Sequence, residues 1–176
     1  MQALVIDIEG WEIQMERLLK QIEAYKPCNE QEEKDRELLI QWIRSGMDIV
    51  TRANETAHLT ASAWVVSPDR KQVLMVYHNI YNSWAWLGGH ADGEWNLQKV
   101  AIREVEEESG LSQVTLLQEA PVSLEILTVD GHWKRGMYVS SHLHLNVTYL
   151  MEADPRKPIR KKPDENSAVA WIPVEE

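Results

Sequence analysis

Three glutamates in the middle of the chain have the spacing of a metal-binding group. Glu104, Glu107 and Glu108 lie three and four residues apart, so they face one side of a helix. That side continues an apolar stripe that includes Leu97 and Val100. The usual interpretation of a glutamate-rich helix is a solvated, charged end. Carboxylates that continue a buried stripe need partners instead, because burial penalises an unpaired charge.

A divalent cation is the partner that these carboxylates favour. They repel one another and stand near the C-terminal end of the helix, where the helix dipole disfavours negative charge. Mg²⁺ fits because it takes oxygen ligands and keeps several waters, and Mn²⁺ could replace it. Zinc is disfavoured, because the chain has a single cysteine and no closely spaced histidine and glutamate motif on a helix. His142 and His144 share one face of a strand, where packing or substrate contact is favoured over metal ligation.

The glutamates belong to a longer motif. Residues 103–111 read Arg-Glu-Val-Glu-Glu-Glu-Ser-Gly-Leu, and Gly89 precedes them. The segment resembles the Nudix box, in which a glycine, five residues, a glutamate and seven residues precede Arg-Glu-apolar-any-Glu-Glu-any-Gly-apolar. Residues 103–111 match the second part at every defined position. The resemblance extends more weakly over residues 58–173.

One position departs from the box. Counted from Gly89, its first glutamate falls on Trp95, and Glu94 comes one position early. In the family this glutamate mainly supports the loop before the helix. The departure therefore concerns the geometry of the loop more than catalysis.

The resemblance implies an enzyme that hydrolyses a pyrophosphate bond with the help of Mg²⁺. Its substrate would be a nucleoside diphosphate linked to another moiety, such as a nucleotide sugar, an ADP-ribose-like compound or a nucleoside triphosphate. Glu104, Glu107 and Glu108 would bind the metal together with the backbone carbonyl of Gly89, and Arg103 would orient a glutamate. The metal would polarise a phosphoryl oxygen and acidify a water.

The general base has two candidates. Families that share this box draw it either from the box, here Glu104, or from a later loop. Glu165 is the loop candidate, and a solvated turn acid is the alternative interpretation of that residue.

Substrate-binding residues are expected outside the box. Lys134 and Arg135 could contact phosphates, with an exposed turn as the alternative, and His142 and His144 are further candidates. Trp84 and Trp86 alternate before the glycine loop, so one of them is expected to stack on a base and the other to enter the core. Trp86 is the substrate-binding candidate. The only basic run, residues 156–162, is interpreted as a solvated loop.

The elements around the motif predict an α/β (α+β) fold, and the resemblance implies that this fold is the Nudix α/β/α sandwich with a mixed sheet. Residues 1–54 form an N-terminal helical segment, a hairpin of two helices, and residues 55–176 form the Nudix hydrolase domain. The ranges with helical periodicity are 11–25, 30–50 and 95–109, the last ended by Gly110; the strand-like ranges are 58–66, 72–78, 84–87, 114–129, 137–152 and 168–172. Residues 154–166 are expected to form a loop interrupted by prolines.

Composition narrows the class of function. The net charge of -10 disfavours binding to a nucleic-acid backbone, and no apolar run is long enough to span a membrane. The single cysteine and the lack of basic residues in positions 1–10 predict a cytoplasmic protein. The alternative function is a catalytically weak, Nudix-like module that binds a nucleotide and regulates a partner. A homodimer through the helical hairpin is compatible with both functions.

Overall fold

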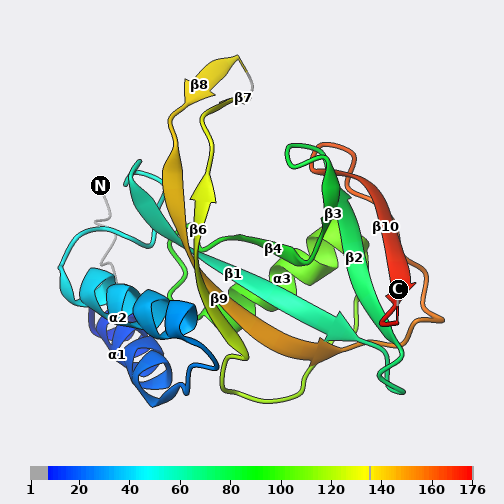
Figure 1. Ribbon diagram of the computed structural model, residues 1–176, viewed down its shortest axis with the longest axis horizontal. Coiled ribbons are helices and arrows are strands. Elements are labelled where there is room, and N and C mark those ends of the chain that lie inside the picture. The colour runs from blue at the N-terminus through cyan, green and yellow to red at the C-terminus, as the bar shows by residue number, and fades with distance from the viewer. Residues whose placement is uncertain (1–7, 135, 176) are drawn as a thin grey trace, which may run out of the picture.

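The computed structural model describes residues 8–134 and 136–175 (Figure 1). Arg135, and residues 1–7 on which the cytoplasmic prediction partly rests, lie outside this range. The helices are α1 (Ile8–Ala24), α2 (Glu30–Arg44) and α3 (Leu97–Ser109). The strands are β1 (Ala57–Val66), β2 (Gln72–His78), β3 (Ser83–Ala85), β4 (Leu87–His90), β5 (Thr115–Leu116), β6 (Ser123–Val129), β7 (His132–Lys134), β8 (Met137–Val139), β9 (His142–Glu152) and β10 (Asn166–Pro173).

The main sheet is mixed. Its central strands β1 and β9 run parallel, in register from Ala57↔Leu143 to Val66↔Glu152. On one side of this pair β2 and β4 join β1 antiparallel, and β3 and β10 extend β2. On the other side β5 and β6 pair antiparallel with β9. The predicted fold class, a mixed sheet with packed helices and a preceding helical hairpin, is confirmed.

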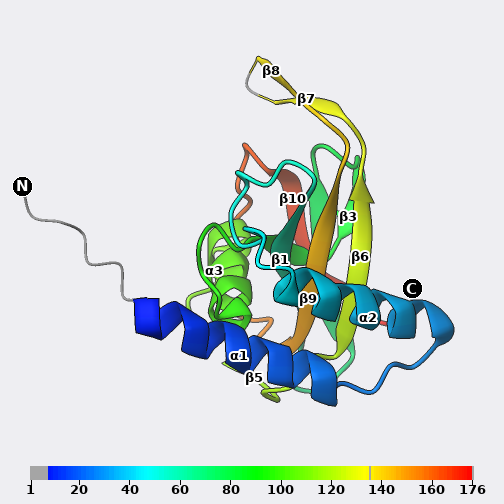
Figure 2. The same ribbon diagram turned by 90° about the vertical axis from the view of Figure 1, so that its left-hand side faces the viewer.

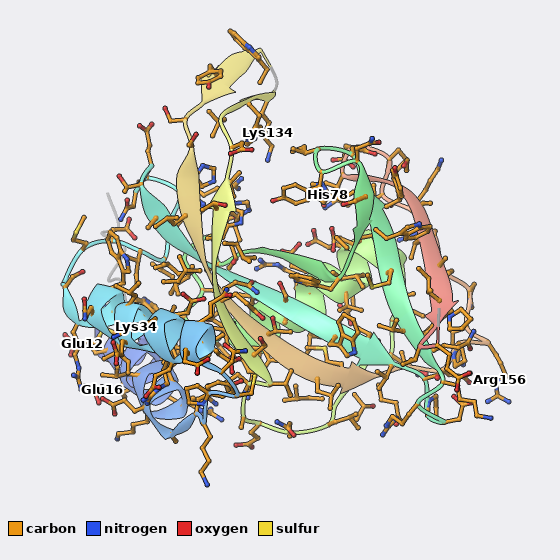
Figure 3. The ribbon with its side chains drawn as sticks, in the orientation of Figure 1. Glu12, Glu16, Lys34, His78, Lys134 and Arg156 are labelled. Atoms are coloured by element: carbon orange, nitrogen blue, oxygen red, sulfur yellow. The ribbon has the colours of Figure 1, made fainter. Side chains whose placement is uncertain are left out.

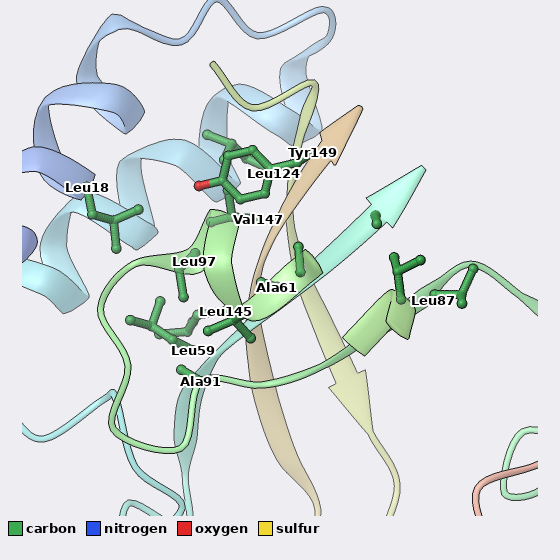
Figure 4. Packing of buried hydrophobic residues seen from close by; sticks show 14 of the residues in the cluster. Leu18, Leu59, Ala61, Leu87, Ala91, Leu97, Leu124, Leu145, Val147 and Tyr149 are labelled. Carbon is green, nitrogen blue, oxygen red and sulfur yellow. The ribbon is translucent and has the colours of Figure 1, made fainter. Parts of the chain in front are cut away.

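The two faces of the central strands differ in chemistry. Along β1 and β9 alternate side chains point to opposite faces. From residue 59 on β1 and residue 145 on β9, the odd-numbered positions are buried and, apart from the tyrosine, wholly apolar: Leu59, Ala61, Ala63 and Val65 on β1, and Leu145, Val147 and Tyr149 on β9. Figure 4 shows several of these side chains packed with Leu97 of α3 and Leu18 of α1.

Six even-numbered positions that pair across β1 and β9 carry polar side chains and form what we call the polar face of the sheet. Its members are His58, Thr60 and Ser62 on β1, and His144, Asn146 and Thr148 on β9. Asn146 organises the centre of this face, because its Oδ1 accepts hydrogen bonds of 2.9 Å from Thr60 and from Ser62. Its Nδ2 donates to Glu125 Oε2 at 2.7 Å. Buried polar groups that satisfy one another in this way hold a fixed arrangement.

The N-terminal hairpin lies beside β6, through α2 (Figure 2). Two acidic residues of α2 accept hydrogen bonds from backbone N–H groups of β6, Glu32 from Leu124 at 3.2 Å and Asp35 from Ile126 at 3.1 Å. The helix thereby covers a strand edge that would otherwise be open for pairing. The division of the chain at residue 54 stays a prediction.

Several predicted boundaries were wrong. The second helix ends at Arg44, not near residue 50, because Ser45 caps it and Gly46 follows with a φ of 72°. The strand expected over residues 137–152 is divided into β8 and β9. The first part, β8, pairs with β7 in a separate hairpin that projects from the main sheet (Figure 1).

Candidate active site

Helix α3 carries the acidic stripe, and its ends are fixed by side-chain and glycine caps. Asn96 Oδ1 accepts from the backbone N–H of Lys99 at 3.2 Å, and Gly110 ends the helix in the left-handed conformation with a φ of 74°. Glu104 and Glu108 are buried, and Glu107 stays partly exposed. Two of the three carboxylates thus continue the buried side of the helix, as the spacing predicted.

Glu104 lies directly against the glycine loop. Its Oε1 accepts from Arg103 Nη2 at 3.0 Å, and the same guanidinium nitrogen donates to the His90 carbonyl at 3.0 Å. A Cβ on Gly89 would stand 2.4 Å from the Glu104 carboxylate, so only glycine permits this approach. Burial raises the pKa of Glu104, although the Arg103 guanidinium opposes the shift.

Glu108 is the most buried member of the group. Its side chain lies under β4, where Oε2 accepts from the backbone N–H of Gly88 at 3.0 Å. Burial raises its pKa to about 8, and the Gly88 hydrogen bond only partly offsets this effect. Two buried carboxylates whose pKa values rise in this way are poorly compensated by the described protein groups. This chemistry fits a divalent cation bound to oxygen ligands.

The third carboxylate joins the helix to the last loop. Lys162 Nζ lies 3.1 Å from Glu107 Oε2 and 3.1 Å from Glu165 Oε2. Burial would lower the pKa of Lys162, but the two hydrogen-bonded carboxylates outweigh it and raise this pKa. Buried Asn166 fixes the loop, because its Nδ2 donates to the Glu108 carbonyl at 3.1 Å. The structure thus brings Glu165 to the box glutamates.

Lys162 and Asn166 were missed by the sequence interpretation. Lys162 ends the basic run that was interpreted as a solvated loop, and for this residue the interpretation was wrong. Its position one turn before Glu165 was the available signal. Asn166 had no such signal, because its hydrogen bond to α3 joins positions 58 residues apart.

The departure from the box at Trp95 has a structural counterpart. The Trp95 ring stacks on Trp11 of α1, with ring centroids 6.5 Å apart. Glu94 Oε1 accepts from the backbone N–H of Asn96 at 3.0 Å, and its Oε2 pairs with Lys99 Nζ at 2.8 Å. Glu94 thus holds the start of α3 from one position earlier, and Trp95 ties this loop to the hairpin.

The tryptophan expectation was wrong in one respect. Trp84 and Trp86 are 42% and 39% exposed, so neither enters the core. Trp84 makes an edge contact with Tyr77, with ring centroids 5.6 Å apart. Trp86 remains available for contact with a flat ring.

Lys134 lies on β7, and in Figure 3 it stands across from His78 at the end of β2. Its charge is close enough to contribute to lowering the pKa values of His78, His90 and His144, although burial is the main cause of each shift. Lys134 is therefore near the polar face of the sheet, and the neighbouring Arg135 lies outside the described residues.

His142 and His144 meet two histidines that the sequence interpretation missed. His58 and His90 join them, so imidazoles from β1, β4 and β9 gather at one end of the polar face. Burial lowers the pKa of His90 to about 2 and that of His144 to about 3, so both are neutral near pH 7. The alternation of polar residues along residues 58–62 was the signal that could have shown His58.

Comparison with known proteins gives the same family as the motif. The model of the NUDIX domain matches residues 56–176, so the chain belongs to the NUDIX domain family. The expected class, a Nudix-type pyrophosphohydrolase, is thereby confirmed. A search of curated proteins gave no match. Among the described residues no helix is both long and apolar enough to cross a membrane.

Solved structures with a similar fold are distant. An Ap4A hydrolase from C. elegans, in a binary complex, is 19% identical, with 66% of this chain and 80% of that chain covered and a TM-score of 0.47. A NUDIX hydrolase from Clostridium perfringens is 20% identical, with coverages of 67% and 82% and a TM-score of 0.47. The E. coli dihydroneopterin triphosphate pyrophosphohydrolase is 16% identical, with coverages of 65% and 79% and a TM-score of 0.48. Similarities this distant say nothing about the substrate.

Proposed function

We propose that this chain hydrolyses a pyrophosphate bond in a nucleoside diphosphate linked to another moiety, and that it does so with Mg²⁺ or Mn²⁺. The observation that supports this most is the pair of buried carboxylates, Glu104 and Glu108, against the backbone of Gly88 and Gly89. Such groups are costly to keep charged without a cation. The family membership supplies the reaction class, and the cation and the substrate belong to the proposal.

Glu104, Glu107, Glu108 and the Gly89 carbonyl would hold the cation. Bound there, it would neutralise charge on the diphosphate and acidify the attacking water. Arg103 is a positioning residue, because it clamps Glu104 to the His90 carbonyl through one guanidinium nitrogen. Its charge also lies near Glu107, 4.0 Å from Oε1.

For the general base we favour Glu165 over Glu104. The Glu104 carboxylate is buried and already engaged by Arg103, whereas Glu165 is partly exposed and lies beside the group through Lys162. Glu165 would accept the proton of the attacking water, and the Lys162 ammonium would hold its carboxylate near Glu107. Glu165→Gln should therefore lower kcat and flatten the acidic limb of the pH–rate profile. A kcat that is lowered with an unchanged profile would return the role to Glu104.

Substrate contacts are proposed for three residues. Trp86 offers a partly exposed ring for stacking on a base, and Lys134 offers a cation for phosphate. Arg135 would assist Lys134 as the next residue in the sequence. Contact of the substrate with His142 and His144 stays a sequence-based prediction. We expect the enzyme to work in the cytoplasm.

The test is product release from a panel of nucleoside triphosphates, ADP-ribose, nucleotide sugars and dinucleoside polyphosphates with added Mg²⁺. Turnover of one class supports the proposal and names the substrate group. The second candidate is a weakly active nucleotide-binding module, which the Trp95 substitution in the box motivates. Thermal stabilisation by a panel member without any turnover would favour that module and contradict hydrolysis.

A further inference from the structure

Four of the six histidines of the chain gather at one end of the polar face, although they come from three separate strands. His58 lies on β1, His90 ends β4, and His142 and His144 begin β9. Donor nitrogens of His58, His90 and His144 all lie within 4.8 Å of one another. Ring centroids are 5.1 Å apart for His58 and His90, and 4.9 Å apart for His90 and His144.

The hydrogen bonds leave lone pairs directed into this cluster. His58 Nδ1 lies 3.0 Å from the Asn54 carbonyl, and since a carbonyl only accepts, Nδ1 carries the proton. Its Nε2 is then an acceptor, and this buried atom has no hydrogen-bond partner among the described residues. His142 Nδ1 likewise lies 2.8 Å from the Ser140 carbonyl, but its Nε2 accepts a hydrogen bond from His144 Nε2 at 3.2 Å. Histidines that bind metals are commonly oriented by such a bond from the other ring nitrogen.

The spacing would let a metal take the place of the proton that His142 and His144 share in the metal-free protein. His142 Nε2 and His144 Nε2 are 3.2 Å apart. Two nitrogens bound to one tetrahedral zinc at ~2.0–2.1 Å would be separated by about 3.3 Å. If the histidines served only to pack the fold, the buried His58 Nε2 would need a hydrogen-bond donor. The described residues offer none.

We propose that His58, His90 and His144 form a binding site for a transition-metal dication of the zinc class, with His142 beside it. Neutral imidazoles suit Zn²⁺, Cu²⁺, Ni²⁺ and Fe²⁺, whereas Mg²⁺ prefers oxygen. This site differs from the carboxylate group. Successive residues of a strand point to opposite faces, so the position of the Gly89 side chain faces Glu104 while the His90 side chain faces the histidines.

A metal at this site would act on the loop that positions the active site. It would join β1, β4 and β9 through one residue from each strand. The His90 carbonyl is also the acceptor for Arg103, which holds Glu104. The site would therefore fix the glycine loop from the side opposite to the carboxylates. This inference does not depend on hydrolysis, because its test is metal binding itself.

The experiment is equilibrium dialysis of untagged protein against Zn²⁺ in excess Mg²⁺, with bound zinc measured by mass spectrometry of the metal. Co²⁺ serves as a second probe, because its visible absorption reports the ligand geometry. The test variant is His58→Gln/His144→Gln, and His78→Gln is the matched control, since His78 lies outside the cluster. Glu107→Gln controls for zinc on the carboxylates. Circular dichroism of the metal-free variants establishes that each is folded.

We expect one zinc per chain in the wild type, in His78→Gln and in Glu107→Gln, and at least a tenfold weaker affinity in the double variant. Tetrahedral Co²⁺ absorption should follow the same pattern. Zinc binding that survives in the folded double variant, or that is lost in Glu107→Gln, would overturn the proposal. So would the absence of bound zinc in the wild type.

Discussion

The two sides of strand β4 show two ways to assemble a group of ligands. On one side, Glu104, Glu107 and Glu108 come from two turns of one helix. On the other side, the histidine cluster draws residues from β1, β4 and β9. The first group could be read from spacing alone, because a helix fixes which neighbours share a face. The second exists only through strand register, which places His58 opposite His144.

The glutamate group and the histidine cluster also differ in the chemistry of their ligand atoms. Carboxylate and carbonyl oxygens suit hard ions such as Mg²⁺, and imidazoles suit the zinc class. Burial acts in opposite directions on the two groups, since it raises the pKa of Glu108 and lowers that of His90. In both cases burial favours the neutral form. A bound cation would reverse this preference for the carboxylates and would need no proton loss from the neutral imidazoles.

The largest expected effect is that of Glu107→Gln. We expect turnover to fall by about 10²–10³-fold, the range for losing one well-placed electrostatic group in an active site. Folding should persist, because the change relieves repulsion among the glutamates and the ion pair with Lys162 that it weakens is partly exposed. The matched control is Glu106→Gln, an exposed residue of the same helix, which should keep near wild-type rates. Unchanged activity in Glu107→Gln would refute the assignment of the carboxylate side.

Gly89→Ala should have the next largest effect. The added Cβ would stand 2.4 Å from the Glu104 carboxylate and push it from its place. A displacement of about 1 Å can cost on the order of 10²-fold in rate. The measurement is kcat/KM for the single variants and for Gly89→Ala/Glu104→Gln. The two changes should be strongly non-additive, and additive losses would show that Gly89 acts elsewhere.

The Lys134→Ala variant tests whether the substrate contacts the side of β4 that carries the histidine cluster. A charged hydrogen bond to phosphate contributes about 1.5–3 kcal/mol, so KM should rise roughly tenfold or more with little change in kcat. Lys161→Ala, in an exposed part of the last loop, is the matched control. An unchanged KM in Lys134→Ala would show that the substrate contacts only the side of β4 that carries the glutamates.

The smallest expected effect is a change in how the stability of the fold depends on pH. Without metal, the folded state holds the Glu108 proton up to a pKa of about 8, while the unfolded carboxyl loses it near ~4.3. The free energy of unfolding contributed by this group therefore falls as pH rises between these values. Mg²⁺ binding to the carboxylate should raise Tm more at pH 8 than at pH 6, and Glu108→Gln should reduce that difference. Equal Mg²⁺ stabilisation of the wild type at both pH values would contradict this account.

The sequence predicted the parts of the molecule that depend on local spacing. Helix α3 ends at Ser109 with Gly110 as its cap, as expected, and the loop over residues 154–166 contains no strand before Asn166. The hairpin of β7 and β8 was missed, because the change of partner after Val139 depends on tertiary contacts. Lys162 reaches Glu107 across 55 positions, a contact that periodicity cannot show.

The central claim is that this chain is a hydrolase whose carboxylates work with Mg²⁺. The most direct measurement is nucleotide or phosphate release from the best substrate of the panel, before chelation, after chelation, and after addition of Mg²⁺ alone. We predict that chelation abolishes turnover and that Mg²⁺ alone restores it. Turnover that continues after chelation, or that Mg²⁺ fails to restore while Zn²⁺ succeeds, would contradict the account.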